Sequence, residues 1–152
     1  MSKILISGYY GFANAGDEAM LTAIIESLRQ VEKNVELTVL SGNPEDTAAK
    51  HQVCSVYRFN PLGIIQAMKD SELIISGGGS LLQDVTSKRS LLYYLSIIGL
   101  GKFFGKKVML FAQGIGPIRA KWARKLTSLV CNEADLITVR DSESAAELIE
   151  MG

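Results

Sequence analysis

Residues 3–18 read KILISGYYGFANAGDE, an apolar run followed by a glycine-rich turn and the start of a helical pattern. The apolar run predicts a strand at 3–7, and the helical pattern begins at Asp17. Strand, turn and helix in this order present backbone N–H groups to an anion or a polar substrate in α/β proteins. Gly8, Gly11 and Gly16 allow the backbone to bend sharply and to approach a ligand closely. The stretch therefore predicts an α/β fold and a candidate site at its first turn.

The side chains of this turn indicate something other than a simple phosphate cradle. Carboxylates at Asp17 and Glu18 complement the dipole of the helix that follows but repel a phosphate. The phosphate-binding fingerprints GxxxxGK[ST] and GxGxxG are both absent from the sequence. A tight turn with an acidic first helical turn is the structural alternative. Glycines, an amide, carboxylates and aromatic rings that suit a sugar (Tyr9, Tyr10 and Phe12) fall in one loop, which favours function. We predict substrate contacts at Gly8, Tyr10, Asn14, Gly16 and Glu18, and a catalytic role for Asp17.

Strands and helices alternate along the rest of the chain. Apolar and β-branched runs predict further strands at 35–40, 53–57, 72–76, 107–112 and 136–139. Helical spacing and helix-start signals predict helices at 17–32, 44–50, from 61 onward, and at 91–104, 119–134 and 141–151. Such alternation implies βαβ units with right-handed crossovers. We predict one Rossmann-like α/β domain over 1–152, with a doubly wound, mainly parallel six-stranded sheet in the order 3-2-1-4-5-6 and helices on both faces.

Doubly wound sheets bind ligands beyond the carboxyl ends of their strands. Polar or glycine-rich loops follow the first, fourth, fifth and sixth predicted strands. Each loop has a structural alternative when it is taken alone: a flexible loop, a tight turn, or a local ion pair between Arg140 and Asp141. Four such loops on one rim of the sheet favour a shared site. Arg140 can make a forked contact with a carboxylate or phosphate, and we predict a catalytic role for it. The further predicted substrate contacts are Gly77, Gly78, Gly79, Gln83, Gln113 and Gly114.

Composition excludes several classes of function. Sixteen basic and sixteen acidic residues give zero formal net charge, which argues against a nucleic-acid surface. Neither a signal peptide nor a membrane-spanning run is expected. Cys54 and Cys131 lie far apart and are expected to be reduced thiols of a cytoplasmic protein. His51 is the single histidine, so neither a Ser-His-Asp triad nor a multi-histidine metal site is expected, and we predict no metal and no cofactor.

Four motifs in order, GYYGFANAGDEAML, SGGGSLLQD, AQGIGP and VRDSES, resemble those of the polysaccharide pyruvyl transferase family. Members resemble two-domain glycosyltransferases of the GT-B type and move pyruvate from phosphoenolpyruvate onto two sugar hydroxyls, forming a ketal. In bacterial cell-wall members the sugar is an N-acetylmannosamine, and the product anchors surface-layer proteins. The resemblance puts Asn14, Asp17 and Arg140 on positions tied to substrate binding or catalysis. Asp17 would then act as base or hydroxyl orienter, and Arg140 as anion clamp.

The resemblance spans the first half of the family's usual length. It implies that the C-terminal domain, with a histidine and a lysine of the site and the proton donor, lies outside this chain, so residues 1–152 alone are expected to fold without turning over. The implied partners are phosphoenolpyruvate, a sugar acceptor that is lipid-linked in one interpretation, and that C-terminal half. Nucleic acid is not expected. The alternatives are half of a nucleotide-sugar glycosyltransferase, an NAD-binding domain, or a non-catalytic sugar-binding domain.

The predicted helix at 91–104 is apolar nearly all round. Such a helix is either buried in the domain or forms an interface. Lysines and an arginine flank it, which leaves open a peripheral membrane contact of a cytoplasmic protein, a homo-oligomer contact, or burial within this domain. The later helix at 119–134 is expected to turn Trp122, Leu126, Leu129 and Val130 inward.

Overall fold

The computed structural model describes residues 2–77, 79–83 and 87–152. Its strands are β1 (Lys3–Ser7), β2 (Glu36–Ser41), β3 (Cys54–Tyr57), β4 (Leu73–Ser76), β5 (Gly79–Leu82), β6 (Lys107–Ile115) and β7 (Leu136–Val139). Its helices are α1 (Ala15–Val31), α2 (Pro44–His51), α3 (Pro61–Asp70), α4 (Lys88–Phe103), α5 (Lys121–Cys131) and α6 (Ser142–Met151).

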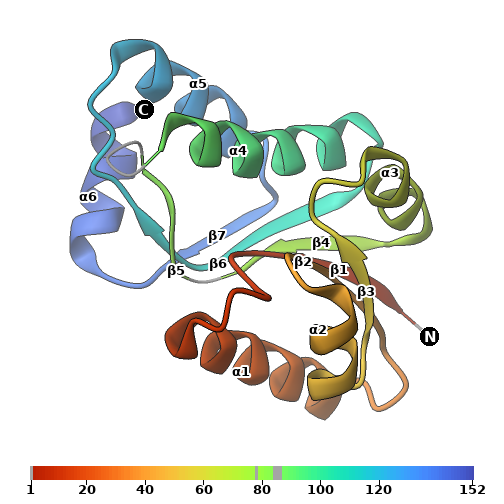
Figure 1. Ribbon diagram of the computed structural model, residues 1–152. Coiled ribbons are helices and arrows are strands. Elements are labelled where there is room, and N and C mark those ends of the chain that lie inside the picture. Colours follow the sequence, from red (N-terminus) through yellow and green to blue (C-terminus); the bar gives the residue numbers. More distant parts are fainter. Residues whose placement is uncertain (1, 78, 84–86) are drawn as a thin grey trace.

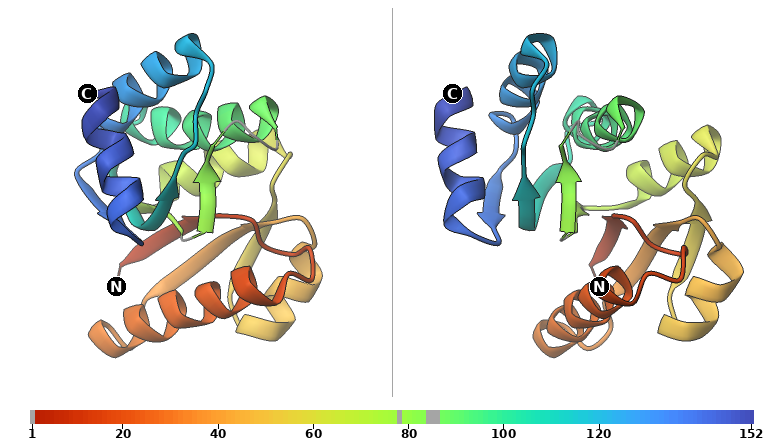
Figure 2. Two further views of the ribbon diagram at one scale, coloured as in Figure 1. Left: turned by 90° about the vertical axis from the view of Figure 1, so that its left-hand side faces the viewer. Right: turned by 60° about the vertical axis from the view of Figure 1, so that its left-hand side comes forward.

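The sheet has the predicted doubly wound topology. Neighbouring strands run in the order β3-β2-β1-β4-β6, and β7 pairs with the other edge of β6, all in parallel. Figure 1 shows α1 and α2 on one face of the sheet and α3 and α4 on the other, and Figure 2 shows the same layers from the side. The predicted α/β class, strand order and two-sided helix cover are confirmed.

Within the described residues the structure adds a seventh strand, β5, to the six that the sequence predicts. β5 continues the path of β4 along β6, since Ser76 pairs with Leu110 and Gly79 pairs with Gln113. Glycine has no side chain to show a strand pattern, yet its backbone joins a ladder as well as any other residue. The glycine-rich segment therefore reads as a loop in the sequence although part of it belongs to the sheet.

The core lies on both faces of the sheet because β1 is buried on both. Ile4 and Ile6 pack toward α1, while Leu5 between them packs with the residues of α3 and α4. This alternation is the two-residue period of a strand, and a strand covered on both sides is apolar at every such position. The carboxyl end of β1, where the first loop begins, is thereby held rigidly.

Helix α4 is mostly interior. Six of its residues are buried, and Leu92, Leu100 and Phe103 form its exposed edge. The interpretation of this helix as a buried element is therefore the main one that the structure supports. No helix among the described residues is long and apolar enough to cross a membrane.

The inward face of α5 differs from the prediction. Trp122 and Leu129 are exposed, while Ala123, Thr127 and Cys131 are buried at a spacing of four residues. Because α5 packs against neighbouring helices, small side chains fit this contact better than large ones, and the bulky residues point outward. Leu126 and Val130 are partly buried against the core, as predicted.

Gly11 is the glycine of the first loop whose replacement we expect to be most damaging to folding. Its φ is +84°, and an added Cβ would lie 2.5 Å from the backbone nitrogen of Asn43 and closer still to Ser41 Oγ. Ser41 Oγ cannot withdraw easily, because it is hydrogen-bonded to Thr47 and accepts from the Asn43 N–H. Gly11→Ala is expected to lower the free energy of unfolding by roughly 2–5 kcal/mol through backbone strain and overpacking.

The measurement is the urea midpoint of Gly11→Ala beside a matched glycine variant in a helix. Gly99 in α4 has no atom within 4 Å of its added Cβ, so Gly99→Ala should be neutral or stabilise by about 0.5–1 kcal/mol. Equal midpoints for Gly11→Ala and the wild type would show that the loop relaxes around the new methyl group.

Candidate functional site

A pocket of about 670 Å³ opens beyond the carboxyl ends of the strands. The loop after β1 forms one wall, β5 and α4 form a second, and the ends of β6 and β7 form a third. This is the rim at which doubly wound sheets bind ligands. The lining residues are Tyr9, Asn14, Gly16, Asp17, Met20, Leu81, Gln83, Ser90, Tyr94, Ala112 and Arg140.

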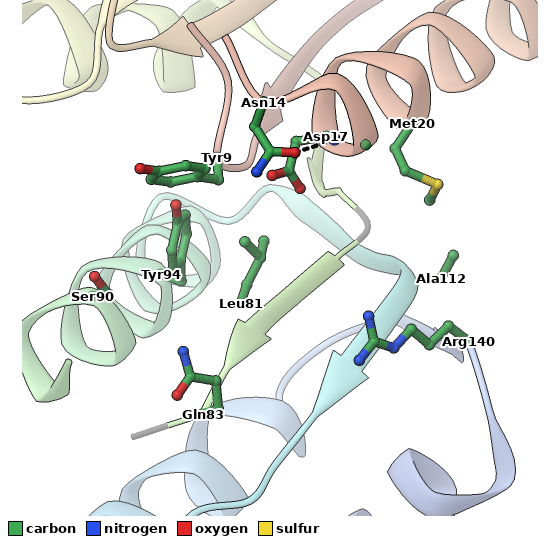
Figure 3. Close-up of a pocket in the computed structure, with 11 residues that line it drawn as sticks. Tyr9, Asn14, Asp17, Met20, Leu81, Gln83, Ser90, Tyr94, Ala112 and Arg140 are labelled. Atoms are coloured by element: carbon green, nitrogen blue, oxygen red, sulfur yellow. Dashed lines mark hydrogen bonds between the residues drawn. The ribbon is translucent and has the colours of Figure 1, made fainter. Parts of the chain in front are cut away.

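Both residues predicted to be catalytic line this pocket. Figure 3 shows Asp17, from the first turn of α1, and Arg140, from the end of β7, entering the hollow from different walls. Burial raises the pKa of the Asp17 carboxyl above its ordinary value, and the neighbouring charge of Glu18 raises it further. A carboxylate with a raised pKa is a stronger base than a solvated aspartate. The pocket thus combines a carboxyl of raised pKa with a guanidinium.

Arg140 also has the local ion-pair partner that the sequence left open. Its Nε lies 3.3 Å from Asp141 Oδ2. The other carboxylate oxygen, Asp141 Oδ1, accepts a hydrogen bond of 2.7 Å from the Ser144 N–H and so caps α6. Hydrogen bonding to Ser144, with the Arg140 charge as a smaller cause, lowers the pKa of Asp141. The ion pair does not take Arg140 out of the pocket lining.

Asn14 is both a pocket residue and the N-cap of α1. Its Oδ1 accepts from the Asp17 N–H at 3.2 Å, and its backbone carbonyl accepts from the Glu18 N–H at 2.9 Å. The side-chain nitrogen points into the pocket (Figure 3). An N-cap of this kind fixes the first helical turn, so Asn14 also sets the position of Asp17.

A bulge in β6 shapes the third wall. Leu110 pairs with Ile137 and Gln113 with Val139, so β6 has one residue more than β7 between these pairs. Ala112 takes a left-handed φ of 48° there, and its N–H donates to Thr138 Oγ1 at 2.7 Å. Bulges re-aim side chains beside functional sites, and this one brings Ala112 into the pocket lining.

Tyr10 is a predicted contact residue that the structure places in the core. Its ring is fully buried and packs under Gly8 and Gly77, where any added Cβ would strike it. Burial, followed by the charge of Asp17, raises the pKa of Tyr10. Tyr10, Gly8 and Gly77 therefore pack in the core below the first loop and do not line the pocket. The two glycines are required by this ring.

Gln113 and Gly114 are likewise buried in β6. Gln113 Oε1 accepts a hydrogen bond of 3.1 Å from Ser76 Oγ, which links β6 to the end of β4. The sequence predicted a strand that ends at residue 112, but β6 extends to Ile115, so both residues lie within the strand and not in a loop after it. They support the wall to which Ala112 belongs.

Glu18 points away from the pocket. Its Oε2 lies 3.9 Å from Nε2 of His51 on the side of α1 that faces α2. Successive residues of a helix point about 100° apart, so Asp17 and Glu18 cannot share one face. A direct substrate contact by Glu18 in this pocket is not supported by that placement.

The glycine segment after β4 is divided among different environments. Gly78 lies outside the described residues, and Gly79 begins β5. Gln83 and Gly16, two of the predicted contact residues, line the pocket. Six lining residues were missing from the predicted contacts. One is Tyr9, which the sequence marked only as a ring that suits a sugar. The other five are apolar or helical positions that carry no signal of their own before the topology is known: Met20, Leu81, Ser90, Tyr94 and Ala112.

No group of three His, Cys, Asp or Glu side chains that would suit a metal ion is found among residues 2–77, 79–83 and 87–152. The chemistry available to the pocket from the described chain is that of a carboxylate, a guanidinium, amides and hydroxyls.

Comparison with the sequence models of known families identifies a relationship. The sequence model of the family described as polysaccharide pyruvyl transferase matches residues 14–152. The matched region includes Asp17 and Arg140, and it covers far more than half of the chain. No curated protein matches the chain at the level required for a reliable relationship.

Proposed function

This chain belongs to the polysaccharide pyruvyl transferase family, and from that premise we propose that it takes part in moving pyruvate from phosphoenolpyruvate onto two hydroxyls of a cell-wall sugar. The observation that carries the proposal is the placement of Asp17 and Arg140 on different walls of one pocket. A ketal-forming transfer needs a base for sugar hydroxyls and a cation for the carboxylate and phosphate of the donor.

The donor belongs beside Arg140. Phosphoenolpyruvate carries a carboxylate and a phosphate, and a guanidinium fork contacts either with two parallel hydrogen bonds. Of the described residues that line the pocket, Arg140 is the one with a positive charge. A single cation leaves much of the donor's charge unbalanced, which fits a site completed by a second domain of the full-length enzyme.

The reaction comprises protonation of the donor, displacement of phosphate by one hydroxyl, and closure of the ketal by the second hydroxyl. A proton adds to the methylene carbon of phosphoenolpyruvate and makes the carbon that bears the phosphate electrophilic. A sugar hydroxyl attacks that carbon and loses its proton, and the C–O bond to phosphate breaks. The second hydroxyl then attacks the same carbon and loses its proton. The products are a ketal of pyruvate and inorganic phosphate.

Asp17 accepts the proton of an attacking hydroxyl in this scheme. Its raised pKa makes it a stronger base than a solvated aspartate. Asn14 fixes the helical turn that carries Asp17 and offers its amide nitrogen to the acceptor. The acceptor hydroxyls therefore approach from the α1 wall, while the donor anion lies toward the β7 wall.

The test uses the full-length enzyme with phosphoenolpyruvate and a synthetic N-acetylmannosamine glycoside. We expect phosphate release that depends on both substrates, together with a new methyl singlet of the ketal in the proton NMR spectrum. Phosphate release without the acceptor would indicate a phosphatase. Transfer from a nucleotide sugar in place of phosphoenolpyruvate would identify a glycosyltransferase and overturn the proposal.

A further inference from the structure

Arg58, directly after β3, is a buried cation whose surroundings are aromatic. Only 5% of the residue is exposed. Its guanidinium carbon lies 4.6–5.9 Å from the centroids of five rings among the described residues. Those rings belong to Tyr9, Phe12, Phe59, Tyr93 and Tyr94. Burying a charge is costly unless the charge is compensated, and ring faces attract a guanidinium. Arg58 therefore holds these rings together as they hold it.

Arg58 is itself anchored by its backbone. Its N–H donates to Ser41 O at 3.0 Å, and its carbonyl accepts from the Tyr93 hydroxyl at 2.7 Å. Nε of Arg58 has no hydrogen-bond partner among the described residues. No ion pair of Arg58 is found in the described part of the chain, so its position depends on the backbone hydrogen bonds and on the surrounding rings.

Two of the rings around Arg58, those of Tyr9 and Tyr94, also line the pocket. Tyr9 and Phe12 of the first loop stack with centroids 4.3 Å apart and planes 14° from parallel. Both rings remain about two-fifths exposed, and Tyr9 lines the pocket. Phe12 lies against Gly42, where an added Cβ would come within 2.5 Å of its ring. An exposed aromatic pair fixed from below in this way is a rigid platform and not a mobile loop tip.

The chemistry around Tyr9 differs from that around Arg140. Figure 3 shows Tyr9, Tyr94, Ser90 and Gln83 on the side of the pocket away from Arg140. Among the described lining residues that side offers rings, a hydroxyl and an amide, and the Arg58 cation behind Tyr9 is buried among rings. Such a surface suits an uncharged polyol ring better than a phosphate or carboxylate.

We infer that Tyr9 is the platform for the acceptor's sugar ring and that Arg58 is a positioning residue that holds Tyr9 in place. The inference rests on the proposed function and assigns the acceptor to one wall of its pocket. An acceptor on Tyr9 lies on the wall that also carries Asn14 and Asp17, since all three residues come from the loop and turn after β1. Its hydroxyls then face the base.

The test compares two pairs of variants of the full-length enzyme. Tyr9→Ala removes the ring, whereas Tyr9→Phe keeps it and is the matched control. Tyr9→Ala is expected to raise the acceptor KM by about tenfold, from the loss of one aromatic contact, without changing the phosphoenolpyruvate KM. Tyr9→Phe keeps the ring surface, so its acceptor KM should rise much less than that of Tyr9→Ala.

Arg58→Met removes the charge with little change in volume, and Arg58→Lys restores a cation at the rings. Arg58→Met should raise the acceptor KM as Tyr9→Ala does, and Arg58→Lys should rescue part of the effect. A merely structural role would lower the melting temperature and the active fraction while leaving the acceptor KM unchanged. If Arg58→Met does not fold, the comparison of Tyr9→Ala with Tyr9→Phe still decides the inference, because Tyr9 is partly exposed.

A binding measurement separates this inference from the proposed function. Saturation-transfer NMR of the N-acetylmannosamine glycoside with wild type and Tyr9→Ala needs no turnover. Loss of the signal in Tyr9→Ala and its retention in Tyr9→Phe would support the platform even if phosphoenolpyruvate were not the donor. Equal signals and equal acceptor KM values in all variants would overturn the inference while leaving ketal formation standing.

Discussion

Replacing Asp17 with asparagine is expected to lower the turnover of the full-length enzyme by roughly 10²–10⁴-fold, the contribution typical of a general base. Asparagine preserves the size of the side chain, and the capping bond at this position uses the backbone N–H of residue 17, which any residue keeps. The loss should therefore appear in kcat with little change in substrate affinity. Turnover near that of the wild type would remove Asp17 from the mechanism and leave Asn14 as the polar group of that wall.

The stability of the same variant supplies an internal control. The pKa of Asp17 is raised in the folded state, so folding disfavours its charged form. That penalty is fully present above the folded pKa and is relieved as the pH falls through it. Asparagine removes the penalty but also loses the favourable interaction with the helix dipole, worth about 0.3–1 kcal/mol. The two effects oppose each other, and we expect a melting temperature within a few degrees of the wild type.

Both quantities should be measured on one preparation, with Glu26→Gln as the matched charge removal. Glu26 lies on the same helix at an exposed position outside the pocket. The kcat/KM of the wild type should also decrease as the pH is lowered, because the ionised base is the active form. The midpoint of this acid limb of the pH profile should lie above the ordinary pKa of an aspartate. Asp17→Asn should abolish that limb. An unchanged limb would assign it to another group.

Replacing Arg140 with glutamine is expected to lower kcat/KM for phosphoenolpyruvate by roughly 10²–10³-fold, the usual result of truncating one partner of a charge-assisted pair. Arg140→Lys should recover only part of this, because an ammonium cannot make two parallel hydrogen bonds to a carboxylate or phosphate. The acceptor KM should be unaffected, since the acceptor is assigned to the opposite wall.

Asp141→Asn is the control for the ion pair. Asparagine also caps helices well, so α6 should remain intact. Removing the Asp141 charge takes away the ion-pair partner that lies 3.3 Å from Arg140 Nε, and donor affinity should stay the same or improve. If Arg140→Gln left the phosphoenolpyruvate KM and kcat unchanged, Arg140 would be a structural ion-pair residue only.

The fold was largely predictable because its signals are local and repeated. Apolar runs and helix-start residues recur along the chain. One rule about parallel sheets then locates the rim whose pocket is lined by Asn14, Asp17 and Arg140. β5 was missed because Gly79 and its neighbours carry no strand pattern, although their backbone pairs with β6.

The details of the pocket depend on contacts that sequence spacing does not encode. Tyr9 and Tyr10 are adjacent and chemically identical, yet one lines the pocket and the other is fully buried. Arg58 has no charged neighbour in the sequence to mark it, and its partners come from three separate segments. Ala112 has a left-handed φ although it is not a glycine, so its residue type does not predict this conformation. Each of these features arises from tertiary packing that overrides local preference.

The aromatic packing around Arg58 bears on how such an enzyme can acquire a new acceptor. Residues 9–12 carry the exposed rings, but the cation beneath them follows β3 and the rings on its far side belong to α4. A loop transplanted from a relative would bring its rings without their support and would lose its shape. With the acceptor on Tyr9, as we propose, a change of acceptor preference requires the loop and the residue after β3 to be replaced together. Variation at these two distant positions should then be inherited as a pair.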